Sequence, residues 1–442
     1  MYFDYARDFE MRSSYYHQVQ NVLNQRERFE RETRRIIIGL ESEIGLHLGP
    51  TSFNAIEDAR ANILRRLPEG TGDVELGLSQ LEIRTDPIQL HSGLDWKNVL
   101  NIYEDIFKKV RVAAKEEGVA ILRIGANPFL PAENTPRTNK KKYQSVPDFH
   151  NQFKSRLKKT RIGKNGCSVD VHDAAVVGNL QSFQINLEAQ SLTDSVDKLN
   201  RSLMIAPFLS AISGNARYLD CTDTQFDDVR MIAWEKSHEV RVSTSEEARI
   251  GLPNRYFSNI EHYFNRCGSF PFILFNPENA LSIAIGLNWL DTRIKLIGDS
   301  AVVEMRILST QPTLEEEMDL CIFWVGRLAY SQMQREKLMP LSKVRFNRLQ
   351  AMKNGMNKVM WFLEDNKFVL KDCRHGLRNE IQKAMEGLSY LGLREEVDMS
   401  AFLEKLLIPT PSIQLARILD QRERIKENEM MDALKNLGMF LA

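Results

Sequence analysis

The chain has 442 residues, of which 43% are hydrophobic and 27% charged, and its 59 basic residues balance its 59 acidic ones. This length predicts one large domain or two to three ordinary ones. The neutral charge argues against a protein that wraps nucleic acid or is held electrostatically on a membrane. The apolar content excludes a mainly disordered chain, because hydrophobic burial can offset the entropy lost on folding.

The cysteines and the N-terminal residues predict a protein of the reduced cytoplasm. The five cysteines are spread along the chain without a CxxC pair, which fits neither a secreted disulfide framework nor a zinc site. The opening stretch, MYFDYARDFE, mixes acids and bases and does not resemble a signal peptide. No segment reaches the about 20 apolar residues of a membrane span. We therefore expect a cytoplasmic protein with neither a membrane nor a nucleic-acid partner.

Hydrophobic periodicity predicts a mixed α+β chain that ends in helices. The pattern predicts, in chain order, a surface helix over 8–33, a strand over 35–48, a helix over 55–67, a strand or hairpin over 73–85, a helix over 95–117, strands over 119–124 and 180–188, a helix over 193–216, and a pair of strands over 281–289 and 301–308. Thr313 and Glu316 form a capping box that predicts a helix to about residue 337. From there to Ala442 the pattern predicts helices throughout.

The segment 137–164 is strongly basic, with ten Lys or Arg residues against the single acid Asp148. A solvated loop and helix is one interpretation of it. A cover over a polyphosphate is another, and nucleic-acid binding is the least favoured because the rest of the chain is not basic. The pattern leaves these alternatives open.

Four predicted strands place polar side chains on one face, because residues i and i+2 of a strand point the same way. The outer face of any antiparallel sheet gives this pattern without a function. These faces, however, are rich in glutamates, which raise one another's pKa when crowded unless cations neutralise them. Mg²⁺ would do so through carboxylate and amide oxygens, and a neighbouring arginine would hold a phosphoryl group. The residues concerned are Glu41, Glu43, Glu82, Gln184, Asn186, Glu304 and Arg306.

At these strands the sequence resembles the glutamate–cysteine ligase type 2 family and related carboxylate–amine ligases. The stretches GLESEIGL, LEIRTDP, SFQINLE and VVEMRILSTQPTLEE are similar to four strands of that family. Weaker similarities follow in family order: GANPF at 125–129, with Asn127 where His is common, the stretches 213–217 and 252–263, the pair Arg230 and Trp234, and NRLQAMKNG at 347–355. Motifs for a P-loop, a zinc protease helix and a Rossmann turn are absent from the sequence.

The resemblance implies a fold related to glutamine synthetase, in which a curved antiparallel sheet forms a funnel for Mg²⁺ and ATP, with helices outside. It implies a helical segment over 1–33, a catalytic sheet domain over 34–311, and a helical region over 312–442 packed on that domain. It also implies that two or three Mg²⁺ ions are held by Glu41, Glu43, Glu82, Gln184 and Glu304. Asn186 and Arg306 would meet the phosphates, with Arg306 and Glu304 catalytic, and Arg230 would bind the carboxylate of the substrate.

The function expected from the resemblance is an ADP-forming ligase that joins a carboxylate to an amine through an acyl phosphate. Glutamate is the favoured carboxylate, because the SFQINLE strand resembles the plant-type glutamate–cysteine ligases. Cysteine is the first choice for the amine, although the sequence identifies no residues for a thiol pocket. The alternative is a non-catalytic relative, or a binding or interaction protein, whose acidic strands are only a solvated face. The sequence leaves the formation of a homo-oligomer open.

Overall fold

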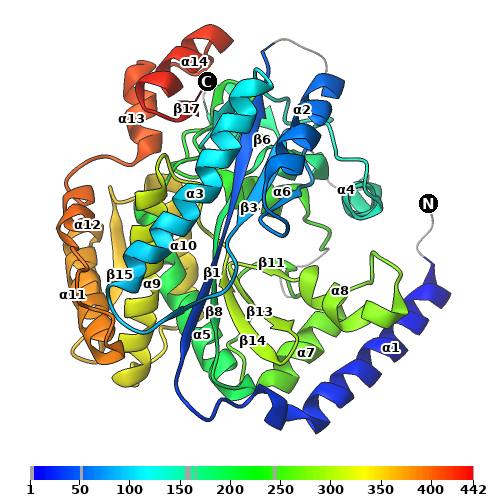
Figure 1. The fold of residues 1–442 in the computed structure, drawn as a ribbon, viewed down its shortest axis with the longest axis vertical. Helices are drawn as coiled ribbons and strands as arrows, with labels where there is room; N and C mark the ends of the chain where they lie inside the picture. The colour runs from blue at the N-terminus through cyan, green and yellow to red at the C-terminus, as the bar shows by residue number, and fades with distance from the viewer. Residues whose placement is uncertain (1–3, 50–52, 155–160, 165–166, 242–245, 442) are drawn as a thin grey trace.

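The computed structural model describes residues 4–49, 53–154, 161–164, 167–241 and 246–441. In this part of the chain, a nine-stranded antiparallel sheet runs through the middle of the molecule, with helices packed against it (Figure 1). Its main path is β13–β14–β8–β1–β3–β2, with β4 and β5 paired to β1, and β17 to β5. The strands are β1 (Ile36–His47), β2 (Gly72–Val74), β3 (Gln80–Arg84), β4 (Ile88–Leu90), β5 (Ala120–Leu122), β8 (Phe183–Glu188), β13 (Thr292–Ile297), β14 (Ser300–Met305) and β17 (Phe440–Leu441).

Strand β1 carries side chains of opposite character on its two faces. Ile38, Leu40 and Ile44 are buried in the main hydrophobic core. Glu41 and Glu43, at the intervening positions, are partly exposed on the other face. This is the alternation that a strand imposes on its side chains, and the prediction for this segment is confirmed.

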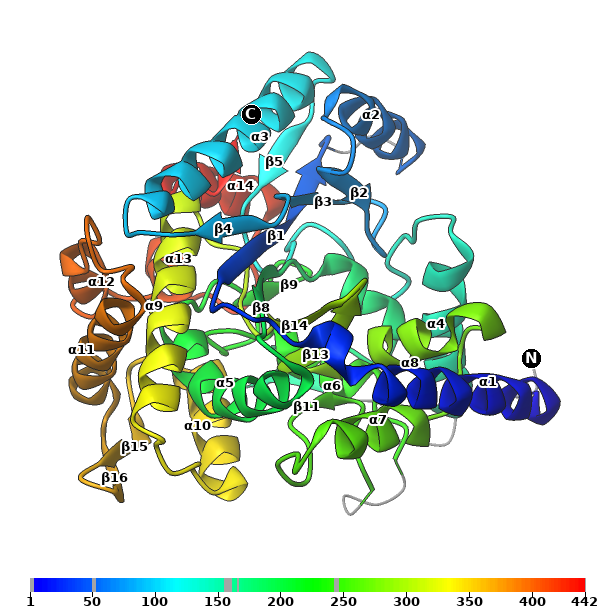
Figure 2. The ribbon, with the colours of Figure 1, turned by 60° about the horizontal axis from the view of Figure 1, so that its bottom comes forward.

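Helices cover the apolar face of the sheet (Figure 2). Helix α5 (Leu192–Ile212) packs on β13 and β14, α9 (Leu314–Met333) on β8, and α3 (Asp95–Glu116) on β3. Helix α9 begins with the predicted capping box, in which the Thr313 side chain accepts from the Glu316 N–H and the Glu316 side chain accepts from the Thr313 N–H. The α+β class with a curved antiparallel sheet and a helical C-terminal layer is confirmed.

The outermost helical layer depends on a close approach of two backbones. Helix α11 (Cys373–Leu391) lies along α9, and a Cβ atom at Gly387 would overlap the carbonyl oxygen of Gly326. In the same interface, Arg327 forms buried ion pairs with Glu380 and Glu336. The absence of side chains at both glycines therefore sets how near the two helices lie.

The N-terminal helix packs on the body of the protein. Helix α1 (Tyr5–Asn24) lies against α7 (Ile260–Ser269) and α8 (Ala280–Gly286), as both views show (Figures 1 and 2). Tyr15 is buried, and its hydroxyl donates to the Phe264 carbonyl oxygen at 2.6 Å. The helix predicted over 8–33 ends earlier, and a short 3-10 turn, Arg26–Phe29, leads into β1.

Two predictions of secondary structure were wrong. The strand predicted over 281–289 is helix α8 followed by β12 (Trp289–Leu290), and the partner of β14 is instead β13. Leu281, Ala284 and Ile285 are buried, and this spacing forms one face of a helix. The uniformly helical C-terminal region contains a hairpin of β15 (Val359–Glu364) and β16 (Lys367–Asp372), whose turn residues Asp365 and Asn366 have positive φ.

The remaining elements surround the sheet. They are the helices α2 (Phe53–Arg66), α4 (Lys141–Lys154), α6 (Arg230–Ser237), α10 (Leu341–Asn354), α12 (Ser400–Lys405), α13 (Pro411–Ile418) and α14 (Glu427–Asn436), the 3-10 helices η2 (Ala174–Asn179) and η3 (Pro277–Asn279), and the strands β6 (Arg161–Lys164), β7 (Cys167–Asp170), β9 (Tyr218–Leu219), β10 (Thr222–Asp223) and β11 (Ile250–Gly251). Among the helices described, every one is too short or too polar to span a membrane.

One hydrophobic core joins the N-terminal helix, the sheet and the helices up to α12. A second, smaller core lies between β5, β17, α13 and α14. The main core contains Met11 near the N-terminus, Leu40 of the sheet and Phe323 of the helical region. The boundaries expected at 33/34 and 311/312 stay predictions, and the three segments between them share this core.

Candidate active site

The polar faces of four strands meet on the open side of the sheet. The pairing register places Glu41 opposite Gln184, and Glu43 opposite Glu82. Asn186 lies on β8, which pairs with β14 on one side and with β1 on the other, and it stands opposite Glu304 of β14. Long-range strand pairing thus brings together side chains that the sequence placed on one face of each strand.

A triad of carboxylates lies at one end of this surface. Oxygens of Glu43, Glu75 and Glu82 all lie within 4.8 Å of one another. Burial, followed by mutual repulsion, raises the pKa of Glu82 well above its usual value and the pKa of Glu43 and Glu75 to about 7. We call these three residues the acidic triad. Glu75 follows β2 in the chain and was not among the residues predicted from the sequence.

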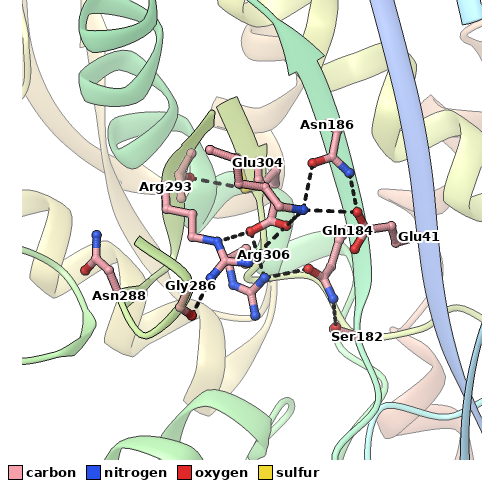
Figure 3. A network of polar contacts seen from close by, with 12 residues as sticks. Glu41, Ser182, Gln184, Asn186, Gly286, Asn288, Arg293, Glu304 and Arg306 are labelled. Atoms are coloured by element: carbon pink, nitrogen blue, oxygen red, sulfur yellow. Dashed lines mark hydrogen bonds and ion pairs between the residues drawn. The ribbon is translucent and has the colours of Figure 1, made fainter. Parts of the chain in front are cut away.

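A second cluster is centred on the fully buried Glu304, as Figure 3 shows. Arg306 Nη1 donates to Glu304 Oε2 at 2.7 Å, and Arg293 pairs with the same oxygen. Lys295 Nζ lies 2.5 Å from Glu304 Oε1. Burial alone would raise the pKa of Glu304, but the charges of these three cations outweigh it and hold that pKa well below its usual range.

Gln184 connects the two halves of the site. Its Nε2 donates to Glu43 Oε1 at 3.2 Å, and its Oε1 accepts from Arg306 Nη1 at 2.6 Å. Asn186, two residues along β8, donates to Glu41 Oε1 at 2.9 Å. These contacts fix the amide orientations, so each amide presents its oxygen to a cation and its nitrogen to a carboxylate.

Arg230 lies beneath Arg306. It is 1% exposed, and its Nη2 donates to the Arg306 carbonyl oxygen at 2.7 Å. Its Nε is buried without a hydrogen-bond partner, and burial lowers the pKa of the guanidinium. The guanidinium carbon of Arg306 lies 5.9 Å from the centre of the Trp234 ring. Both residues of the Arg230–Trp234 motif therefore approach Arg306, and the role of Arg230 toward a substrate carboxylate stays a prediction.

The backbone that carries Arg306 is fixed by an ion-pair network outside the sheet. Asp291 accepts from the Arg306 N–H at 2.9 Å through its carbonyl oxygen, while its carboxylate pairs with Arg348 at 2.5 Å. Arg348 also pairs with Glu235 of α6 at 2.7 Å. A cavity of about 710 Å³ lies on this side of α6, lined in part by His238, Glu235 and Arg348, and it contains none of the acidic triad.

The basic segment reaches the acidic triad through α4. The Tyr143 hydroxyl donates to the Val74 carbonyl oxygen at 2.8 Å, next to Glu75. The charge of Lys142 acts to lower the pKa of Glu75, against the larger effect of burial. Residues 155–160 and 165–166 lie outside the described residues, so the segment 137–164 is described only in part, and both of its main interpretations, a solvated loop and helix or a cover over a polyphosphate, stay open.

The donor set of the acidic triad fits a hard divalent cation. Mg²⁺ binds six oxygen ligands at about 2.1 Å, so adjacent ligands lie about 3 Å apart and opposite ligands about 4.2 Å apart. The triad oxygens lie within 4.8 Å of one another, so a bound cation would draw them closer together and would relieve their repulsion. Around Glu304, by contrast, three cationic side chains already occupy the carboxylate. The metal roles predicted from the sequence all stay predictions, for Glu41, Glu43, Glu82, Gln184 and Glu304.

Three residues of the site were missed from the sequence. Glu75 lies seven positions before Glu82 in an irregular stretch, where alternation gives no signal. Arg293 and Lys295 alternate with apolar residues in TRIKLI, so the pattern of a strand was present. The prediction placed the partner of the strand over 301–308 at residues 281–289, so Arg293 and Lys295 lay outside the predicted sheet.

Comparisons with known proteins identify a family for this chain and solved structures with a similar fold. The family described as Glutamate-cysteine ligase family 2 (GCS2) matches residues 37–396. A glutamate–cysteine ligase of Francisella tularensis, solved in complex with AMP, has a TM-score of 0.58 at 14% identity, over 93% of this chain and 89% of that one. A bifunctional glutathione synthetase of Pasteurella multocida has a TM-score of 0.52 at 12% identity, over 96% of this chain and 54% of that one. These two matches show similarity of fold alone. No curated protein gives a significant match.

Proposed function

The chain belongs to the glutamate–cysteine ligase family 2, and on this premise we propose that it joins a carboxylate to an amine at the expense of ATP. Glutamate is the proposed carboxylate and cysteine the proposed amine. The first step transfers the γ-phosphoryl group of ATP to the carboxylate, which gives an acyl phosphate and ADP. The amine then attacks the acyl carbon and releases phosphate, so an amide bond forms.

The observation that carries this proposal is the contact of Gln184 with both Glu43 and Arg306. Phosphoryl transfer requires alignment of the reactants and neutralisation of charge rather than covalent help from the protein. The acidic triad offers carboxylates for a divalent cation, and Arg306 offers a guanidinium for phosphate oxygens. One buried side chain holds these two groups at a fixed spacing, which the reaction needs.

Each proposed role follows from the chemistry of the side chain. A Mg²⁺ ion at Glu43, Glu75 and Glu82 would neutralise the charge of the phosphates. Arg306 and Asn186 would bind phosphate oxygens, because a guanidinium and an amide are both donors. Arg230 would bind the α-carboxylate of the amino-acid substrate, because a guanidinium can hold a carboxylate by two hydrogen bonds. A cytoplasmic location belongs to the same proposal, since ATP, glutamate and cysteine are small metabolites of that compartment.

A screen of substrate pairs tests the proposal. Purified protein with MgCl₂ and ATP is given glutamate and other carboxylates, each with and without cysteine or another amine, and release of ADP is measured. We expect glutamate-dependent release of ADP that rises with cysteine and yields a γ-linked dipeptide. Release with another pair would keep the ligase and discard these substrates. Absence of release across a broad panel would favour the non-catalytic alternative.

The same assay needs a matched pair of variants. Glu82→Gln removes one charge from the acidic triad, whereas Glu69→Gln removes one from an exposed position of the same region. We expect loss of ADP release in the first variant and unchanged release in the second. Equal activity in both variants would exclude the acidic triad from the reaction.

A further inference from the structure

The ammonium group of Lys295 is surrounded by oxygens of three neighbouring strands. Its Nζ lies 2.5 Å from Glu304 Oε1, 3.1 Å from Glu41 Oε1 and 3.4 Å from Asn186 Oδ1. Two carboxylates and an amide oxygen are a ligand set suited to a hard cation. We propose that Lys295 is the resident cation of this half of the site, which therefore takes no divalent metal ion of its own.

The position of Lys295 follows from strand register. Arg293 stands opposite Glu304 in the β13–β14 ladder, and Lys295 follows two residues later on the same face. From there its ammonium group contacts side chains that extend from β14, β8 and β1, namely Glu304, Asn186 and Glu41. An ammonium group has three protons, which equals the number of oxygens around it.

The charges around Glu304 already favour anions over another cation. Glu41 and Glu304 contribute two negative charges, and Arg293, Lys295 and Arg306 contribute three positive ones. A divalent ion at the same place would have to displace Lys295 and would lie beside two guanidinium groups, with repulsion that is strong in a poorly hydrated site. The acidic triad differs sharply, because its single ion pair among the described residues is Arg84 with Glu82, at 3.5 Å.

The proposal makes Lys295 a positioning residue. It holds the carboxylates of Glu41 and Glu304 in place and neutralises them, while Arg306 on the other oxygen of Glu304 stays directed toward the phosphates. The inference rests on the proposed function, because it concerns the same site and reaction. The inference adds one measurable quantity to the proposed function, which is the number of divalent ions that the protein itself binds.

Counting bound Mn²⁺ tests the inference. Mn²⁺ is added as its chloride without nucleotide, and free Mn²⁺ is measured by electron paramagnetic resonance for the wild type and four variants. We expect one bound ion per chain in the wild type, two in Lys295→Met and one in Lys295→Arg, which keeps the charge. Lys371→Met, which breaks a surface pair with Glu364, is the control and should bind one ion.

A double variant tests whether the second ion binds at the carboxylates that Lys295 contacts. The melting temperature of each variant shows whether it is folded. Glu41→Gln combined with Lys295→Met removes both partners of one ion pair and should return the count to one. Equal counts in the wild type and in folded Lys295→Met would overturn the inference. Two bound ions in both the wild type and Lys295→Met would overturn the inference and leave the ligase proposal intact. A wild type that binds no ion would remove the metal site of the ligase proposal as well.

Discussion

Arg293 and Glu304 stand directly opposite each other in the β13–β14 ladder, and their side chains form an ion pair in the wall of the site. Glu304 is fully buried, and Lys295 and Arg306 bind the same carboxylate. A buried charge is stable only while its partners are present, because each lost partner leaves an uncompensated charge away from water. Glu304 therefore supports both the structure and the electrostatics of the site.

The first prediction concerns Glu304→Gln. The change leaves three cations without their common carboxylate, so we expect a loss of about 3 kcal/mol in the free energy of unfolding and loss of ADP release. Denaturant titration and the ADP assay measure the two effects. Glu364→Gln, which weakens a more exposed pair with Lys371, is the control and should cost less than about 1 kcal/mol. A variant as stable and active as this control would contradict the role of Glu304.

The second prediction concerns Arg306→Lys. Arg306 Nη1 contacts Gln184 Oε1 and Glu304 Oε2 together, and a lysine keeps the charge but loses the planar fork. We expect kcat to fall by about 100-fold or more, with a smaller change in the KM for ATP. Arg422→Lys, at a surface pair with Glu429, serves as the control. Unchanged kcat would mean that Arg306 does not contact the transferring phosphoryl group.

The third prediction concerns Glu75, which only the structure brings into the site. Glu75→Gln removes one of three carboxylates within 4.8 Å, so the affinity for Mn²⁺ should fall by more than about tenfold. Glu69→Gln should leave that affinity unchanged. Titration followed by electron paramagnetic resonance gives both dissociation constants. Identical constants for the two variants would remove Glu75 from the cation site.

The fourth prediction concerns the contact between α9 and α11. Gly387→Ala places a methyl group against the Gly326 carbonyl oxygen, so the helices must separate and we expect a loss of about 2 kcal/mol. Gly286→Ala is the matched control, because a Cβ atom there would meet open space. Thermal unfolding compares the two. A melting temperature of Gly387→Ala at or above that of the control would show that the helices do not depend on this approach.

The fifth prediction concerns pH. Burial raises the pKa of Asp227 to about 7 from its usual 3.8, against a hydrogen bond from Thr410 at 2.6 Å, and the charge of Asp228 raises it further. Arg217 and Arg374 act to lower it. In the unfolded chain the carboxyl loses its proton near pH 4, whereas in the folded protein it keeps the proton to about pH 7. At Asp227 the folded state thus holds more protons across this window, so the contribution of this group to stability decreases as pH rises from about 4 to 7.

Asp227→Asn removes this titration. The shift corresponds to about 4 kcal/mol, so the variant should gain stability relative to the wild type as pH rises from about 4 to 7, and the difference should be constant above. Denaturant titration of both proteins at a series of pH values measures it. A difference that does not change with pH would mean that Asp227 ionises normally in the folded protein. Asp73→Asn, at a half-exposed surface pair with Lys140, is the control.

The sequence alone predicted the faces of the strands and much of the candidate site. Alternation in GLESEIGL and SFQINLE assigned Glu41, Glu43 and Gln184 to polar faces, since a strand directs neighbouring side chains to opposite sides whatever its partners are. The same local rule failed at residues 281–289, where a short apolar run fits a helix as well as a strand. Local patterns therefore determined the composition of the polar faces, and ambiguity remained where the run was short.

Which polar groups meet was decided only by the tertiary structure. Lys295 Nζ reaches Glu41 across 254 positions of sequence, and the acidic triad includes Glu75 from an irregular stretch without periodicity. Strand order and register are set by the joint burial of all apolar faces in one core, which is a property of the whole chain. The sequence by itself determined that carboxylates and an arginine face one side of a sheet. Only the folded chain determined that three carboxylates gather at one end and that three cations surround Glu304 at the other.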